Sequence, residues 1–297
     1  MRDEIMKDKS LYLRTWMLLL GYYCLAISAT HASELNQEPK HRRSSGCGVA
    51  QTGTGTFSPM KIRILDQDRI YRLRVPSTYD LNRAYPIVFR WHGTGGTGQS
   101  GGLGIEFSAG NDAIVVAADG LNKGWSGHSD STDLLLDANY ADYLFSSNPV
   151  DLIFFDRMLD TIAKRYCIDR ERIFSYGFSA GGSFTNLLAC ERGDVLRASA
   201  AIAGWLRGSN CRGKVANWFL HDIDDKGVSI EKGKAARDRV LAINGCSAST
   251  VKDNSVCVRY EGCQVAPVIW CETKGFGHNI RSEFAPARVW NFFLNFR

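Results

Sequence analysis

The 297-residue sequence predicts an α/β protein with a mainly parallel central sheet and helices on both of its faces. Short, continuously apolar runs, such as 86–91 and 113–118, lack the alternation of a half-exposed strand and are typical of strands covered on both sides. Between several of these runs lie segments whose apolar residues recur at helical spacing. Strands that alternate with helices favour a parallel sheet and place function at the carboxyl ends of the strands.

The first 32 residues have the features of a secretory signal peptide. Residues 16–29 are uncharged and mostly apolar, basic residues precede them, and Thr30-His31-Ala32 provides a small-x-small cleavage context. The stretch is too short to span a bilayer comfortably, although an uncleaved anchor is the alternative. We therefore expect a secreted protein, extracellular or periplasmic, with no membrane association after cleavage.

The remaining chain divides into a tether and one domain. Residues 33–46 are polar and nearly free of large apolar side chains, so we expect a flexible tether there, followed by a single domain over 47–297. The formal charge of the whole chain is only +5, and no basic run extends beyond the short one that ends in His41-Arg42-Arg43. Such a mild balance disfavours nucleic acid as a partner, and we expect a monomer.

The first half of the domain predicts a hairpin, two buried strands and a crossover helix. The hairpin joins 61–65 to 70–75, and the two buried strands are the apolar runs named above. Asn148-Pro149 is a typical helix start. The apolar positions that follow it at helical spacing are Leu152, Phe155, Leu159, Ile162 and Tyr166.

The second half continues the alternation of strands and helices. Residues 172–176 predict a strand that leads into a helix over 183–190. Three more strands and two more helices are expected, the strands at 198–206, 215–220 and 267–271 and the helices at 229–242 and 284–296.

The cysteine content fits an oxidising compartment. One of the nine cysteines lies in the signal peptide, which leaves an even number for up to four disulfides. No C-x-x-C or Cys/His cluster is present, so we expect no metal site and no cofactor. Eight cysteines allow 105 pairings, and the only local expectation is Cys257 with Cys263, across a short segment that contains glycine.

Gly177-Phe178-Ser179-Ala180-Gly181 follows a predicted strand and precedes a predicted helix. A sharp strand-to-helix turn of this G-x-S-x-G pattern exposes a serine hydroxyl for attack on a carbonyl carbon. The flanking glycines let strand and helix pass closely. Ser179 is therefore the predicted nucleophile of an α/β-hydrolase fold.

A nucleophilic serine needs a base, and the base needs a carboxylate. His278 lies between the last predicted strand and the terminal helix, where the base of this fold belongs, and we predict it rather than His221. Three acids follow the strand that ends at 220. We predict Asp225 as the orienting acid, with Asp224 as the next candidate, while at least one of the three caps the turn or the following helix.

The glycine-rich segment 92–96 follows a predicted strand and matches an oxyanion loop. We predict the amides of Thr94 and Ala180 as oxyanion donors, and a structural role for His92. A phosphate-binding loop is the alternative, but neither a Walker motif nor a dinucleotide fingerprint is present. Trp125 also follows a strand, and it is either a substrate-pocket residue or a packing residue of its loop.

Taken together, these motifs resemble secreted feruloyl esterases and their relatives, the acetylxylan esterases and polyhydroxybutyrate depolymerases. The resemblance begins near Ser45-Gly46-Cys47-Gly48 and extends to the C terminus. It implies the same triad of Ser179, Asp225 and His278, and as substrate a feruloyl or acetyl ester on plant cell-wall polysaccharide. A short-chain polyester depolymerase or general carboxylesterase is the alternative enzyme, and a catalytically silent binding protein on this scaffold is the alternative class.

Overall fold

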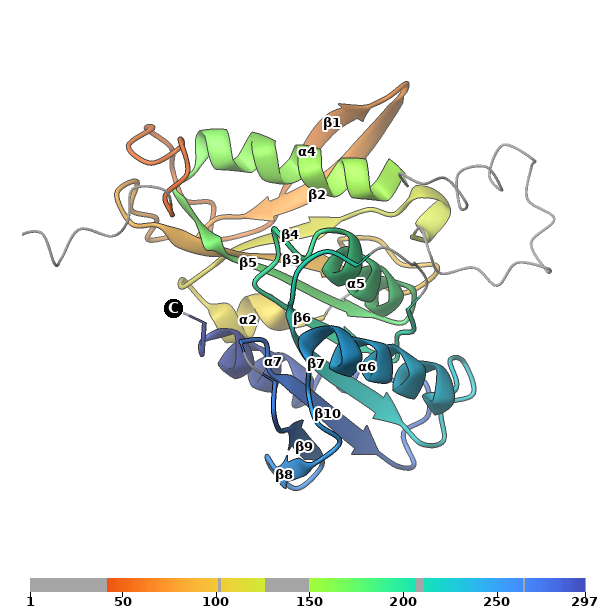
Figure 1. Ribbon diagram of the computed structural model, residues 1–297. Coiled ribbons are helices and arrows are strands. Elements are labelled where there is room, and N and C mark those ends of the chain that lie inside the picture. Colours follow the sequence, from red (N-terminus) through yellow and green to blue (C-terminus); the bar gives the residue numbers. More distant parts are fainter. Residues whose placement is uncertain (1–41, 101–102, 126–149, 207–210, 264, 297) are drawn as a thin grey trace, which may run out of the picture. The chain divides into compact units, whose positions relative to one another are not determined.

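A computed structural model describes residues 42–100, 103–125, 150–206, 211–263 and 265–296. The compact unit from Arg43 onward contains one ten-stranded sheet, ordered β1-β2-β4-β3-β5-β6-β7-β10-β9-β8 (Figure 1). The predicted signal peptide, and the tether as far as residue 41, lie outside the described residues. No described helix is long and apolar enough to cross a membrane.

Six neighbouring strands at the centre of the sheet are parallel. They are β4 (Ile114–Ala118), β3 (Tyr85–Trp91), β5 (Ile168–Phe178), β6 (Ala198–Ile202), β7 (Ala216–Asp222) and β10 (Val268–Thr273). Most of their residues are buried, as continuous apolar runs predict. Antiparallel strands flank them, β1 (Ser58–Ile64) and β2 (Gln67–Arg74) on one side and β9 (Cys257–Tyr260) and β8 (Thr250–Lys252) on the other.

Helices cover both faces of the sheet and divide its core. On one face α4 (Val150–Arg165), α5 (Ala180–Glu191) and α6 (Ile230–Asn244) pack over the strands, as seen in front of the sheet in Figure 1. On the other face α2 (Ile105–Ala109) and α7 (Ala285–Phe293) cover a second cluster that includes Phe174 and Trp218. A short 3₁₀ helix, η1 (Leu121–Lys123), follows β4. The predicted α/β class is confirmed.

The structure moves the start of the domain into the predicted tether. Arg43 pairs with Asp169 in an isolated β-bridge, and Ser44 is buried, with its amide donating to the Ile168 carbonyl at 3.0 Å. A side chain at Gly46 would collide with the backbone of Tyr166, at 2.5 Å. Residues 43–46 therefore belong to the domain. Their polar side chains suggested a tether, but in the structure they hydrogen bond to the domain, as the Ser44 hydroxyl does to the Tyr166 carbonyl at 2.7 Å.

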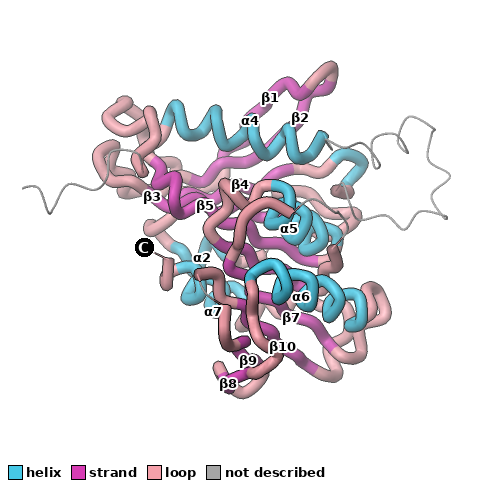
Figure 2. The backbone as a smooth tube through the Cα atoms, in the orientation of Figure 1, coloured by secondary structure: helices cyan, strands magenta, loops and turns pink. Residues whose placement is uncertain are grey.

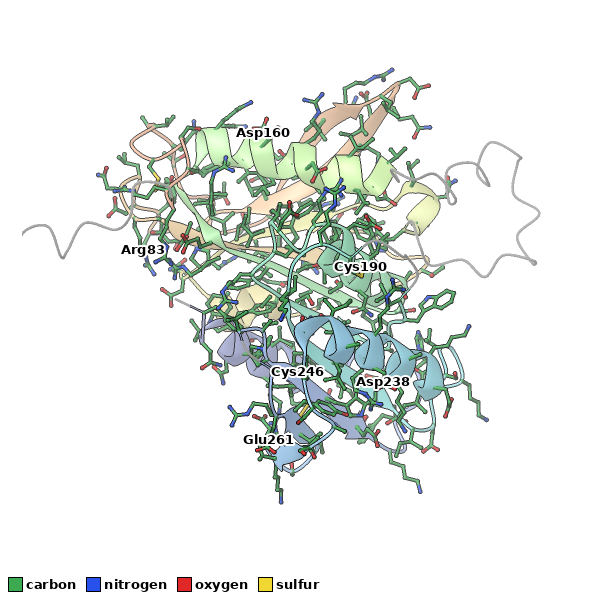
Figure 3. All side chains as sticks on the ribbon, in the orientation of Figure 1. Arg83, Asp160, Cys190, Asp238, Cys246 and Glu261 are labelled. Atoms are coloured by element: carbon green, nitrogen blue, oxygen red, sulfur yellow. A yellow bond between two sulfur atoms is a disulfide. The ribbon has the colours of Figure 1, made fainter. Side chains whose placement is uncertain are left out.

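All eight cysteines after residue 32 form disulfides: 47–167, 190–211, 246–263 and 257–271. Figure 3 labels two of the cysteines involved, Cys190 in α5 and Cys246 after α6. The expected Cys257–Cys263 pair is wrong. Cys257 lies opposite Cys271 in the antiparallel register of β9 and β10, which brings their side chains together. Proximity in sequence could not predict that register.

Candidate active site

The candidate site is built on loops that leave the carboxyl ends of parallel strands. The loops after β3, β5, β7 and β10 emerge at the same edge of the sheet because these strands run in one direction (Figure 2). This edge collects the glycine-rich segment 92–96, Ser179, the acidic segment 222–225 and His278. The candidate residues are therefore brought to one place by topology.

Ser179 lies between β5 and α5 in a strained backbone conformation. Its φ and ψ are 56° and −120°, in a region that residues with side chains seldom adopt. The turn is held by the Ser179 amide, which donates to the Ile202 carbonyl, and by the Ser183 amide, which donates to the Ser179 carbonyl. In this conformation the Ser179 hydroxyl projects away from the neighbouring residues, at the amino end of a buried helix.

The glycines around Ser179 are required by close backbone approach. A Cβ added at Gly177 would lie 2.2 Å from the Gly181 carbonyl oxygen, and one at Gly181 would lie 2.0 Å from the Trp91 carbonyl oxygen. A Cβ at Gly182 would come within 2.6 Å of the Ile202 oxygen. These distances are too short for any side chain, so β3, β6 and α5 meet at this turn only because the residues are glycine.

Ser179, His278 and Asp225 form a continuous hydrogen-bonded series. Nε2 of His278 lies 2.8 Å from the Ser179 hydroxyl oxygen, across 99 positions of sequence, and Nδ1 lies 2.8 and 2.9 Å from the two Asp225 carboxylate oxygens. Asp225 and Ser179 are buried, whereas the His278 side chain is 29 % exposed. With Nδ1 donating to the carboxylate, Nε2 is free to accept a proton from the hydroxyl.

Asp225 is held by two backbone amides, and a second histidine lies beside it. One carboxylate oxygen accepts hydrogen bonds from the amides of Gly227 and Val228, at 2.8 and 2.9 Å. His221 lies 3.5 Å from the other oxygen and hydrogen bonds to the Val228 carbonyl at 2.8 Å. Burial lowers the pKa of His221, so its ring is neutral and donates to that carbonyl. His221 thus holds Val228, whose amide binds the acid, and it is not the base that meets Ser179.

Sequence reasoning missed the part played by the other two acids. The Asp222 carboxylate accepts hydrogen bonds from the amides of Phe276 and Gly277 and from the Thr273 hydroxyl, and Asp224 accepts one from the Gly275 amide. Burial pushes the pKa of Asp222 upward, but these donors outweigh it and lower the pKa. Both acids therefore bind the loop that carries His278. Only the number of acids at the end of β7 and directly after it indicated this.

His92 holds the glycine-rich loop after β3. Its Nε2 accepts a hydrogen bond from the Gly120 amide at 3.0 Å, which makes Nδ1 the protonated nitrogen that donates to the Gly93 carbonyl at 2.7 Å. Burial lowers the pKa of His92 and keeps the ring neutral, as this arrangement requires. The loop runs past Ser179, since a Cβ at Gly93 would lie 3.4 Å from that of Ser179. This arrangement is structural, as predicted for His92.

Each predicted oxyanion donor directly follows one of the two residues that meet at this contact, Gly93 and Ser179. Thr94 follows Gly93 in the loop, and Ala180 is the first residue of α5. Within the described part of the chain, neither backbone amide has a hydrogen-bond partner. The first amides of a helix have no hydrogen-bond partner inside it. The Ala180 N–H can therefore donate a hydrogen bond to an oxygen on which negative charge develops.

Trp125 is buried within its loop, which favours the packing role of the two roles that the sequence left open. It is 2 % exposed, its indole N–H donates to the His92 carbonyl at 2.9 Å, and its ring packs against Trp91 and Phe184. A ring so enclosed supports the loop and has almost no surface to offer a substrate. Among the described residues, no group of three or more His, Cys, Asp or Glu is placed to hold a metal ion.

Comparison with known proteins identifies the family. The chain is 31 % identical to feruloyl esterase D of Neurospora crassa over 284 residues, which cover 85 % of this chain and 90 % of the relative. It is 28 % identical to feruloyl esterase C of Emericella nidulans over 279 residues, covering 86 % and 93 %. No family model matches the chain.

Solved structures support the same fold. The acetyl xylan esterase from Aspergillus awamori superimposes with a TM-score of 0.62 at 14 % identity, covering 81 % of this chain and all of that one. This superposition and the mostly parallel sheet both indicate the α/β-hydrolase fold for this chain. The chain therefore belongs to the feruloyl esterase family and is a carboxylic-ester hydrolase with the α/β-hydrolase fold.

Proposed function

We propose that this protein is a secreted serine esterase that removes feruloyl or acetyl groups from plant cell-wall polysaccharide without a cofactor. The observation that carries the proposal is the hydrogen-bonded series from Ser179 through His278 to Asp225. The identity to feruloyl esterase D favours the feruloyl ester. The apolar leader over 16–29 and the four disulfides support secretion.

The proposed reaction passes through an acyl-enzyme. The Ser179 oxygen attacks the ester carbonyl carbon while His278 takes the hydroxyl proton, and Asp225 stabilises the imidazolium that results. The Thr94 and Ala180 amides donate to the oxyanion, each contributing about 10² to 10³ in rate. His278 then gives its proton to the leaving sugar oxygen as the C–O bond breaks. Water activated by His278 attacks the acyl-enzyme, releases the acid and restores the serine.

A comparison of three substrates tests the proposal. We expect the purified protein to hydrolyse methyl ferulate and a feruloylated arabinoxylan oligosaccharide with a higher kcat/KM than acetylated xylan, and a hydroxybutyrate oligomer least. Ser179→Ala provides the control and should lower kcat by about 10⁴ to 10⁶. Preference for the hydroxybutyrate oligomer would instead identify a polyester depolymerase, and turnover of none of the substrates would favour a silent scaffold.

A further inference from the structure

A cavity of about 440 Å³ lies beside the loop that carries His278. Phe276 lines it two residues before His278, so the two Cα atoms are no more than about 7.6 Å apart. Ile223, from the loop that carries Asp225, lines it as well. The other lining residues that matter here come from β10, α7 and the chain between them: Glu272, Lys274, Arg281, Phe284 and Arg288.

The lining of this cavity is basic. Three cations, Lys274, Arg281 and Arg288, face one carboxylate, and that carboxylate is already engaged. Glu272 accepts a hydrogen bond from the Trp270 indole at 2.8 Å and lies 3.4 Å from the Lys234 ammonium. Within the described residues, neither Lys274 nor Arg288 has an acidic partner. A concave wall of one charge sign attracts a ligand of the opposite sign.

Arg281 is held in place at the wall of the cavity. Its guanidinium carbon lies 3.4 Å from the centre of the Phe276 ring and 4.6 Å from that of Phe284, so the group packs against two aromatic rings. Glu283 pairs with its Nε, but its Nη1 is buried and has no hydrogen-bond partner in the described part of the chain. The guanidinium is therefore a fixed positive charge at the wall of the cavity.

Apolar surface adjoins these charges. Phe276 is 51 % exposed and Ile223 is 47 % exposed, and both border the cavity. A volume near 440 Å³ is large enough for a ligand of one or two sugar rings. The combination of flat apolar surface, rigid guanidinium and two cations without acidic partners suits a ring that carries a carboxylate.

We propose that this cavity binds a uronate, the carboxylate-bearing sugar of an acidic polysaccharide, while a neighbouring ester of the same chain occupies the Ser179 site. The proposal rests on the proposed function because it extends the substrate from an ester to an ester on an acidic chain. The uronate carboxylate pairs with Arg288 and Lys274, and the sugar ring packs against Phe276. The cavity thereby selects esters by the charge of the chain that bears them.

Binding of sugars without any ester tests this assignment independently of catalysis. The full-length mature protein is titrated by calorimetry with a glucuronate-substituted xylo-oligosaccharide, an oligogalacturonide and a neutral xylo-oligosaccharide of equal length. We expect at least one acidic sugar to bind more tightly than the neutral one, and which of them does so identifies the source of the uronate. The preference should weaken as NaCl is raised from about 0.05 to 0.5 M.

A double variant locates the effect. Lys274→Gln/Arg288→Gln should weaken binding of the acidic sugar by about tenfold or more, because two charge-assisted hydrogen bonds are lost. Arg170→Gln is the matched control, since Arg170 is exposed at the amino end of β5, the opposite edge of the sheet, and should leave binding unchanged. Equal affinity for acidic and neutral sugars, or equal losses in both variants, would overturn the proposal.

Turnover separates this proposal from the proposed function. With feruloylated oligosaccharides that differ only in a uronate branch, wild type should show the higher kcat/KM for the acidic one, and the double variant should bring the ratio of the two close to one. If no ester is hydrolysed but the acidic sugars bind as expected, the cavity assignment stands and the esterase proposal fails. If esters are hydrolysed with no uronate preference in binding or rate, the cavity assignment fails alone.

Discussion

Three aspartates within four residues have three different partners. Asp225 hydrogen bonds to His278, whereas Asp222 and Asp224 bind backbone amides of the loop just before it. The difference follows from position: Asp222 is the last residue of β7, beside Thr273 of β10, and Asp225 lies three residues further into the loop. One short acidic segment thus supplies both an orienting carboxylate and a clamp for the loop of the base.

Replacing the two neighbouring candidates separates these roles. Asp225→Asn should lower kcat for methyl ferulate by about 10³ to 10⁴, because the amide no longer fixes the tautomer or stabilises the imidazolium. Asp224→Asn should lower it less than tenfold, since only one exposed hydrogen bond to Gly275 weakens. Thermal unfolding of both variants controls for folding. A larger loss of kcat in Asp224→Asn would reassign the acid.

The strand and helix that position the nucleophile pack with their backbones in direct contact. Strand β3 and the amino end of α5 meet at Gly181, with no volume left for a methyl group. The same contact positions the glycine-rich loop, because the Trp91 and His92 carbonyls against which Gly181 packs lead directly into it. The turn at Ser179 and the predicted oxyanion loop are therefore one packed unit.

Gly181→Ala tests this packing. The added Cβ would lie 2.0 Å from the Trp91 carbonyl oxygen, so backbone must shift, and we expect a loss of more than about 2 kcal/mol in the free energy of unfolding, measured with urea, together with loss of esterase activity. Glu191→Ala, at the far end of α5, is the control and should change stability by less than about 0.5 kcal/mol. Similar stability of the two variants would contradict the packing account.

Some helices and strands can be predicted from the sequence and others cannot, for physical reasons. The strands 86–91 and 113–118 were predictable because burial on both faces leaves a continuous apolar run. Strands β8 and β9 and helix α2 were not, because three to five residues at an edge carry no clear period. The pairing of Cys257 with Cys271 depends on the register of two strands, which only the folded sheet defines.

Across the whole molecule, two buried histidines link stability to pH. Burial lowers the pKa of both His92 and His221 relative to the ordinary value of 6.5. The unfolded chain therefore binds more protons than the folded one as pH falls below about 6.5, so stability that is present above that pH is lost on acidification. Each histidine stabilises a loop at the site, so acid should loosen the site first.

The pH dependence of unfolding tests this linkage. We expect the free energy of unfolding to fall between pH 7.5 and 5.5, and His221→Gln to reduce the slope, because glutamine can still donate to the Val228 carbonyl and does not titrate. Chemical denaturation at four or five pH values measures the slope directly. An unchanged slope in His221→Gln, with native-like activity, would exclude His221 as a source of the dependence.

For the whole molecule, the order of the motifs along the chain was enough to predict which residues the fold brings together. Ser179 and His278 could be named because parallel strands send their carboxyl ends to one edge, whatever their separation in sequence. Trp125 could not be placed, because a tryptophan after a strand serves a pocket or a core equally well until its neighbours are known. Residues 126–149, which follow it, lie outside the described residues.

Labelling with a fluorophosphonate tests the central claim most directly, because only a serine made nucleophilic by its base reacts quickly at neutral pH. We predict a single adduct on the folded wild-type protein, located at Ser179 by peptide mass spectrometry, and at least a hundredfold slower labelling in His278→Ala. Absence of an adduct on Ser179 in folded protein, or equal labelling rates in the two proteins, would contradict the claim that His278 activates Ser179.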